Sequence, residues 1–209
     1  VVTTTTHKTL RGPRSAMVFF KNEYKAQVNE SIFPGLQGGP HNHQIAAVAT
    51  QLYEASKPEF KEYIKQVKKN SEELSDELIN LGYKISSNGT DCHIVLIDLK
   101  NKEIGGSYVE YVCEMVNVAV NKNTVYGDKS ALSPNGIRLG TSAMTTRNLN
   151  DFKWVAGIFD KCVILAKKAK DACDKKGLLA FKSNISSDEY RSEVLKLKKE
   201  VIKRMSNLS

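Results

Sequence analysis

Residues 58–82, PEFKEYIKQVKKNSEELSDELINLG, contain the clearest periodic pattern in the chain. Their apolar side chains recur at spacings of three, four and seven residues, which is typical of an amphipathic helix, at Phe60, Ile64, Val67, Leu74, Leu78 and Leu81. Gly82 suits the left-handed backbone position that ends many helices. We therefore expect one long helix in the middle of the chain, placed to connect two domains.

The residues before this helix predict the end of a larger α/β domain. Val1–Thr6 are all β-branched and indicate the end of a buried strand. Met17–Phe20 indicate a second short strand, and a glycine-rich turn at residues 33–40 leads into a helix that ends at Lys57, before Pro58. We assign residues 1–58 to this domain and residues 59–82 to the connecting helix.

Strands and helices are mixed after residue 83. Strands are expected at residues 83–86, 92–99 and 137–140. Helices are expected at 107–116, with Ser107 as the N-cap, and at 149–170 and 188–205. This pattern predicts that residues 83–209 form a small α/β sandwich domain.

Composition excludes several classes of protein. The chain has 209 residues, of which 41% are hydrophobic and 26% charged, so it can bury a core and is not disordered. No apolar run approaches the ~20 residues of a membrane span. The four cysteines form no C-x-x-C pair, so we expect reduced thiols and no metal site.

The net charge of +8 suggests a nucleic-acid partner as one hypothesis. Residues 161–204 hold 13 Lys and Arg, Lys176 among them, against six acidic residues. These cations fall on the polar faces of amphipathic helices, and no series of aromatic residues is interleaved with them. A solvated helix face is therefore the favoured interpretation, and nucleic-acid binding is the alternative.

Three short strings have the residue types of a catalytic site. Lys8 follows His7, which comes directly after a run of four threonines, and lies near Arg11 and Arg14 in the sequence. An amine close to other cations is favoured in its neutral, nucleophilic form and can form a Schiff base. Gly38-Gly39-Pro40 precedes a helix, where bare backbone amides can bind phosphate. On its own, each string also fits an ordinary exposed lysine or an ordinary turn.

Arg138 lies in a short strand that is otherwise apolar. Its planar guanidinium fits a substrate carboxylate, although an internal ion pair is the alternative. A Schiff-base lysine, a phosphate-binding turn and a carboxylate-binding arginine are together the requirements of a pyridoxal-phosphate enzyme that acts on an amino acid.

The chain also resembles the serine hydroxymethyltransferase family. The matching segments are VVTTTTHKTLRGPRSAMVFF, FPGLQGGPHNHQIAAVA, GTDCHIVLIDL, VNKNTVYGDKSAL and GIRLGTSAMTTR, and they occur in family order. The resemblance implies the end of a fold-type-I pyridoxal-phosphate-binding large domain, followed by the small C-terminal domain. It also implies the interconversion of serine plus tetrahydrofolate with glycine plus 5,10-methylenetetrahydrofolate.

The resemblance assigns roles to ten residues. It implies that Lys8 carries pyridoxal phosphate, that Thr6 and His7 contact cofactor and substrate, and that Arg14 positions the cofactor. Gly38 and Gly39 match a turn that reaches the cofactor phosphate of a partner subunit, which places the site at the interface of a homodimer or tetramer. Arg138 matches the arginine that binds the substrate carboxylate, and a loop that contacts folate corresponds to Ser130, Ala131 and Leu132.

The sequence departs from the family pattern at two positions and in its extent. Ser142 replaces the usual proline, and Asn148 replaces the usual glycine. The family's other catalytic groups precede the lysine strand, so we expect residues 1–209 to be the C-terminal half of the enzyme and to be inactive alone. The reduced cysteines predict a cytoplasmic protein, and a mitochondrial form is the alternative. An aldolase or a transaminase with the same cofactor, and a purely structural dimerisation unit, are the other readings.

Overall fold

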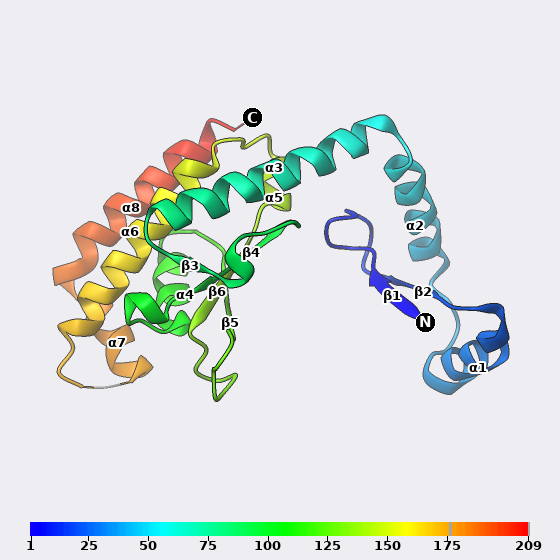
Figure 1. Ribbon diagram of the computed structural model, residues 1–209, viewed down its shortest axis with the longest axis horizontal. Helices are drawn as coiled ribbons and strands as arrows, with labels where there is room; N and C mark the ends of the chain where they lie inside the picture. The colour runs from blue at the N-terminus through cyan, green and yellow to red at the C-terminus, as the bar shows by residue number, and fades with distance from the viewer. Residues whose placement is uncertain (176, 209) are drawn as a thin grey trace. The chain divides into compact units, whose positions relative to one another are not determined.

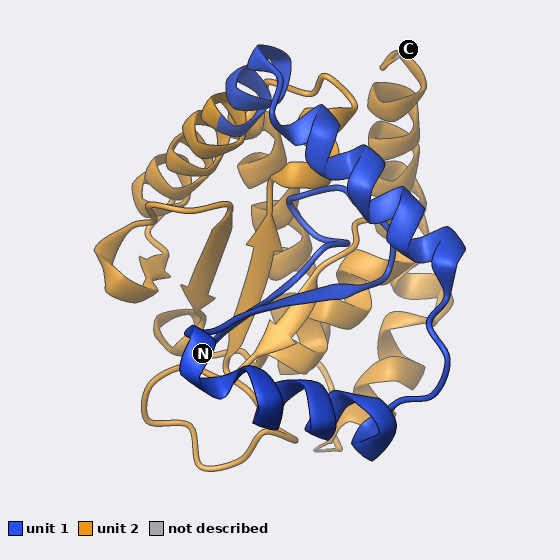
Figure 2. Ribbon diagram, turned by 90° about the vertical axis from the view of Figure 1, so that its right-hand side faces the viewer, with its two compact units in different colours: residues 1–64 blue, residues 65–209 orange. Residues whose placement is uncertain are grey.

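The computed structural model describes residues 1–175 and 177–208, so Lys176 of the basic segment lies outside the described residues. The chain is a mixed α/β structure with two compact units, residues 1–64 (unit 1) and residues 65–209 (unit 2), shown in separate colours in Figure 2. Among the described helices, none is both long enough and apolar enough to cross a membrane.

Unit 1 begins with an antiparallel hairpin of β1 (Val2–Thr5) and β2 (Ala16–Phe19), in which Thr4 is opposite Met17. A 3₁₀ turn (Asn22–Tyr24), α1 (Lys25–Glu30), an irregular turn (Ser31–Leu36) and α2 (Asn42–Ala55) follow. Both predicted strands are therefore present. The prediction that Val1–Thr6 are buried was wrong, because Val1 and Val2 are 73% and 65% exposed and only Thr6 is buried.

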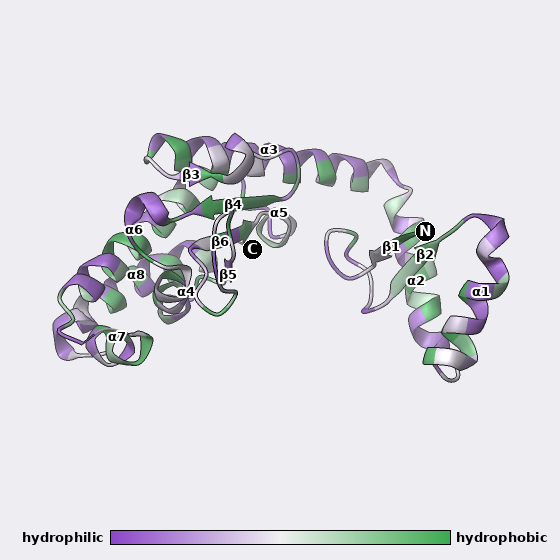
Figure 3. Cartoon of the chain, turned by 60° about the horizontal axis from the view of Figure 1, so that its bottom comes forward, coloured by the Kyte–Doolittle hydropathy of each residue, from purple (hydrophilic) through white to green (hydrophobic). Residues whose placement is uncertain are grey.

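The long helix predicted in the middle of the chain is confirmed as α3 (Pro58–Asn80). It has both polar and apolar faces, as the two colours along its length in Figure 3 show. In unit 2 its buried face consists of Val67, Leu74 and Leu78 together with polar Asn70, Ser71 and Ser75. Gly82 has the positive φ of +78° that a helix-ending glycine provides.

Unit 2 contains a four-stranded antiparallel sheet in the order β3-β4-β6-β5, labelled in Figure 1. Its strands are β3 (Lys84–Ile85), β4 (Ile94–Asp98), β5 (Asn121–Asn123) and β6 (Gly136–Gly140). The predicted strands at 83–86 and 92–99 are confirmed with shorter ends, and the strand predicted at 137–140 is confirmed and begins one residue earlier, at Gly136. The three-residue β5 carries no apolar alternation, so no strand was expected there.

Helices supply most of the core of unit 2. They are α4 (Gly106–Met115), α5 (Ser142–Thr146), α6 (Phe152–Asp171), α7 (Leu178–Ile185) and α8 (Asp188–Ser206). α4 packs against β5, β6 and α6, while α6 also packs against α7 and α8. The buried cluster combines sheet residues with helix residues, including Val95, Ile97, Val109, Phe152, Phe159 and Tyr190.

Helix ends explain where the predicted boundaries were wrong. α4 is preceded by Gly105 as N-cap, with no side-chain cap, so Ser107 is not the capping residue. α6 begins at Phe152 rather than near Leu149, because the Asp151 carboxylate accepts a hydrogen bond from the Trp154 backbone N–H at 3.0 Å. α1, α5 and α7 are too short to show a clear helical period in the sequence.

Candidate active site

The first candidate site is the loop between β1 and β2, which carries Lys8. Backbone hydrogen bonds run from Thr6 N to Ser15 O at 3.0 Å and from Gly12 N to Thr6 O at 2.7 Å. The buried Thr6 hydroxyl donates to Pro13 O at 2.7 Å. A Cβ on Gly12 would come within 2.7 Å of Thr6 O, so this close approach requires glycine. Thr6 therefore fixes the loop rather than leaving its hydroxyl free.

Two polar atoms beside Lys8 are buried without a partner. Within residues 1–175 and 177–208, neither His7 Nδ1 nor Thr9 Oγ1 has a hydrogen-bond partner. Leaving a buried polar atom unpaired costs about 1–3 kcal/mol. Lys8 itself is exposed between them. An exposed amine flanked by unpaired polar atoms fits a site that an additional polar group completes.

The other expected residues of unit 1 are exposed. Arg14 lies near the end of the loop and has no ion pair in the described part of the chain. Gly38 and Gly39 are exposed, and a Cβ built at either would meet no atom of residues 1–175 and 177–208 within 4 Å. α2 starts three residues after Gly39, with no side-chain cap from His41. The backbone at the start of α2 is thus open to a ligand or partner.

Arg138 in unit 2 is exposed on β6, between buried Ile137 and Leu139. The alternation of a strand places its side chain on the face opposite to these two. Its neighbours across the sheet are Leu96 on β4 and Asn121 on β5. Among the residues that the structure describes, Arg138 forms no ion pair, so its guanidinium is free to bind a carboxylate.

The loop at Ser130–Leu132 is exposed and is supported by Asp128. The Leu132 backbone N–H donates to Ser130 Oγ at 3.1 Å, and Leu132 is 89% exposed. The Asp128 carboxylate accepts hydrogen bonds from Val125 N at 3.0 Å, Asn135 N at 2.9 Å and Asn135 Nδ2 at 2.8 Å. Asp128 therefore closes the loop by joining its two ends.

The charge of Asp128 is stabilised by this arrangement. Burial of the carboxylate acts to raise its pKa, but hydrogen bonds from Asn135 and Val125 and the Lys100 ammonium at 3.4 Å outweigh burial. The pKa of Asp128 consequently lies well below its usual range. The loop is held by a carboxylate that stays ionised in the folded protein.

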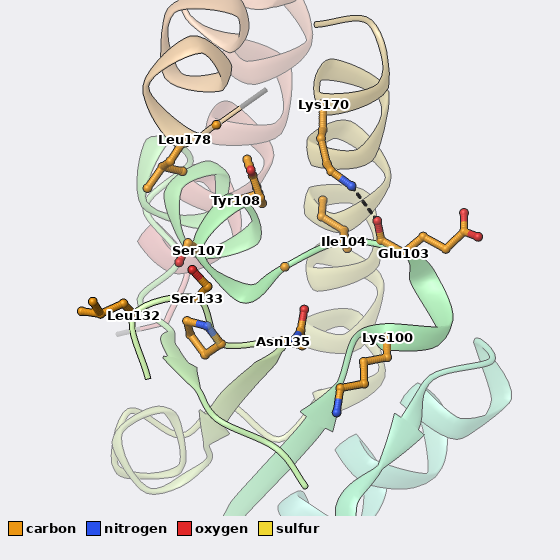
Figure 4. A pocket seen from close by; sticks show the side chains of 13 residues that line it. Lys100, Glu103, Ile104, Ser107, Tyr108, Leu132, Ser133, Asn135, Lys170 and Leu178 are labelled. Carbon is orange, nitrogen blue, oxygen red and sulfur yellow. Dashed lines mark hydrogen bonds between the residues drawn. The ribbon is translucent and has the colours of Figure 1, made fainter. Parts of the chain in front are cut away.

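A pocket of about 540 Å³ borders the same loop. Figure 4 shows its lining, in which Lys170 Nζ donates to the backbone oxygen of Glu103 at 2.8 Å. Leu132 lies at its edge, and the remaining lining is mixed polar and apolar, including Ile104, Ser107, Tyr108, Ser133 and Asn135. A pocket of this size and composition suits a small organic molecule.

The structure groups the expected residues in two sets. One hydrogen-bonded loop of unit 1 carries Thr6, His7, Lys8 and Arg14. The turn with Gly38 and Gly39 is a separate segment of the same unit. Arg138 and the loop at 130–132 belong to unit 2. The sequence interpretation did not assign a role to Asp128, although an aspartate just before an exposed loop is a common signal of side chain to backbone bonding.

The basic segment is paired with acidic residues at several points. Lys161 contacts Glu200 at 2.7 Å, and Lys168 contacts Glu193 at 2.6 Å. Lys167 contacts both Glu103 and Asp171, at 3.3 and 3.2 Å. This mixed charge supports the solvated-face interpretation. Within the described ranges, no cluster of three or more His, Cys, Asp or Glu could hold a metal ion, and the four cysteines are free thiols.

Comparison with known proteins identifies the family. The family model of serine hydroxymethyltransferase matches residues 1–159, so the chain belongs to this family. The cytosolic serine hydroxymethyltransferases of Candida albicans and Saccharomyces cerevisiae are 48% and 47% identical over 94% and 96% of this chain. The mitochondrial enzyme of Schizosaccharomyces pombe is 47% identical over 97% of the chain.

The match covers only part of each relative. It extends over 46% of the two cytosolic enzymes and 45% of the mitochondrial one. The chain therefore spans about half the length of the curated relatives it matches.

Proposed function

We propose that the protein is a glycine/serine hydroxymethyltransferase that interconverts serine plus tetrahydrofolate with glycine plus 5,10-methylenetetrahydrofolate. The observation that carries this proposal is the Lys8 loop, where an exposed amine lies beside buried, unpaired polar atoms of His7 and Thr9. Family membership supports the reaction class. Most relatives compared are named cytosolic, which supports a cytosolic location.

The residues present fit pyridoxal phosphate as the cofactor. The Lys8 amine would hold its aldehyde, and the unpaired His7 Nδ1 would accept or donate a hydrogen bond to its polar groups. Arg14 supplies a nearby cation, which suits an anionic cofactor. When bound, pyridoxal phosphate accepts the electron pair that is left when the Cα–Cβ bond of serine breaks.

Within this mechanism the chain binds and orients the reactants. Arg138 would bind the serine carboxylate through two parallel hydrogen bonds, which fixes the orientation of the amino acid. The exposed loop at Ser130, Ala131 and Leu132, held by Asp128, would contact the folate ring system beside its pocket. The unit containing β3–β6 would then be the small domain of a fold-type-I enzyme, with residues 1–58 in the large domain.

The proposed dimer explains the glycines at 38 and 39. No atom of the described residues lies within 4 Å of a Cβ at either position, so no contact among these residues requires glycine. A partner subunit's cofactor phosphate approaching the backbone would require it. Mixing Lys8→Ala protein with Gly39→Val protein should restore cofactor binding in a shared site. Two sites confined to single subunits would give no restoration.

Reductive trapping tests the cofactor assignment. The purified protein is mixed with pyridoxal phosphate, reduced with borohydride and mapped by mass spectrometry. Labelling is expected at Lys8 and is expected to disappear in Lys8→Ala. The exposed Lys21 of the same unit is the matched control, and Lys21→Ala should label normally. Labelling that survives in Lys8→Ala would contradict the assignment.

The substrate assignment is tested at Arg138. Arg138→Ala should raise the KM for serine about tenfold or more, because a hydrogen bond to a charged group contributes about 1.5–3 kcal/mol. Arg147→Ala, another exposed arginine of unit 2, is the control and should leave the KM unchanged. Comparing serine cleavage with and without tetrahydrofolate separates the proposed transferase from an aldolase, which does not need folate.

A further inference from the structure

Arg11 has an unusual backbone conformation next to Lys8. Its φ is +61°, in the left-handed region that glycine adopts most easily. Its backbone N–H donates to the carbonyl oxygen of Lys8 at 2.8 Å. A non-glycine residue at such a position is strained by about 1–3 kcal/mol. The Arg11 side chain makes an interaction that glycine could not make at this position.

That interaction is a double aromatic contact. The Arg11 guanidinium carbon lies 4.1 Å from the centre of the Tyr63 ring and 5.6 Å from the centre of the Phe60 ring. Both rings belong to the first turns of α3, and they lie 5.6 Å apart. A guanidinium within about 6 Å of a ring centre is attracted by the ring's electrons.

The Lys8 loop is consequently attached at two places. The hydrogen bonds of Thr6 hold it to the hairpin, and the side chain of Arg11 holds it to α3. Because Arg11 N also binds Lys8 O, a shift of Arg11 would move the backbone of Lys8 directly.

We propose that Arg11 is a positioning residue that orients Lys8 through its stacking on Tyr63 and Phe60. This inference rests on the proposed function of Lys8 as the residue that holds the cofactor. Arg11 itself touches neither cofactor nor substrate in this scheme, and its effect passes through the Lys8 backbone.

The first test uses Arg11→Gly, which removes the stacked side chain and also relieves the positive φ. We expect trapping of pyridoxal phosphate at Lys8 to slow about fivefold or more, consistent with the energy of a cation–π contact. The unfolding midpoint should stay unchanged or rise, because the strain is lost together with the contact. A purely structural role predicts a lower midpoint and normal trapping.

The second test needs no cofactor. In the cofactor-free protein, the protection of the Gly12 amide against hydrogen exchange should fall about fivefold in Arg11→Gly and in Tyr63→Leu. The double variant should fall no further, because both changes break one interaction. Lys57→Ala, which removes a separate cation over the Tyr53 ring at 4.7 Å, is the matched control.

Two results distinguish failure of this inference from failure of the proposed function. Normal trapping at Lys8 and normal Gly12 protection in Arg11→Gly would overturn the positioning role alone. A parent protein that is not labelled at Lys8 would overturn the proposed function, and with it the inference that depends on it.

Discussion

Units 1 and 2 differ sharply in how much apolar surface each buries. In residues 1–64 Thr6 is the only buried side chain, and Phe19, Ile45 and Leu52 are exposed. In unit 2, a continuous cluster of buried residues joins the sheet to α4, α6 and α8. The loop that carries Lys8 is therefore held by hydrogen bonds and by the contact of Arg11 with two aromatic rings, whereas Arg138 is held by a packed sheet.

The largest expected effect tests this contrast with one residue type in both units. Phe159→Ala should lower the free energy of unfolding by about 3–5 kcal/mol, because Phe159 is 1% exposed in the core. Phe19→Ala should change it by less than about 0.5 kcal/mol, because Phe19 is 55% exposed. Urea unfolding followed by circular dichroism measures both, and equal losses would remove the contrast.

An intermediate effect is expected at Asp128, whose hydrogen bonds hold a loop on the well-packed unit. Asp128→Asn should lower the free energy of unfolding at pH 7 by about 1.5–3 kcal/mol, the usual range for hydrogen bonds to a charged group. The exposed Asp76 of α3 is the matched control, and Asp76→Asn should have little effect. Equal losses in the two variants would contradict the role of Asp128.

The same carboxylate predicts a pH dependence. The pKa of Asp128 is lowered in the folded protein from an ordinary value of 3.8. Its contribution is therefore complete above about pH 5 and is lost as the pH falls through and below 4. Between pH 6 and pH 3 the parent should lose more stability than Asp128→Asn. Parallel curves for the two proteins would show that Asp128 is not the group responsible.

The smallest effect is expected at the surface of unit 2. Lys161 and Glu200 join α6 and α8 at 2.7 Å, with side chains 52% and 37% exposed. Lys161→Gln should cost less than about 0.5 kcal/mol, and the difference should vanish in high salt. A loss near that of Phe159→Ala would mean that charge, rather than packing, stabilises unit 2.

The sequence predicted the elements that have a strong period. α3, α6 and α8 repeat apolar residues over many turns. β4 is a compact apolar run, and β6 is a short apolar strand interrupted by Arg138, so the burial of these elements can be predicted from the pattern. Burial of Val1–Thr6 was wrongly predicted, because a β-branched run indicates a strand but not what covers it. The N-cap of α4 was wrongly predicted because Gly106 and Ser107, which follow Gly105, suit an N-cap equally well in the sequence.

In the candidate site, too, some residues could be predicted from the sequence and others could not. Lys8, the glycine turn and Arg138 could be selected from residue type and spacing, although their roles came from the resemblance. Arg11 could not be selected in this way, because its backbone conformation and its contact with Tyr63 exist only in the folded chain. The role of Asp128 was likewise missed. Its hydrogen-bond donors, Val125 N and Asn135 N, precede and follow it in the sequence and meet at its carboxylate only when the loop is folded.

α3 also has a consequence for how the chain can be cut. Boundaries between compact units usually fall in exposed linkers, which proteases attack first. Here the boundary between Ile64 and Lys65 lies inside a continuous helix of 23 residues, about 35 Å long. A protease would have to unwind this helix to separate the units. Limited digestion should therefore nick exposed loops, such as the one with Tyr126 and Leu132, before it cuts the chain between Ile64 and Lys65.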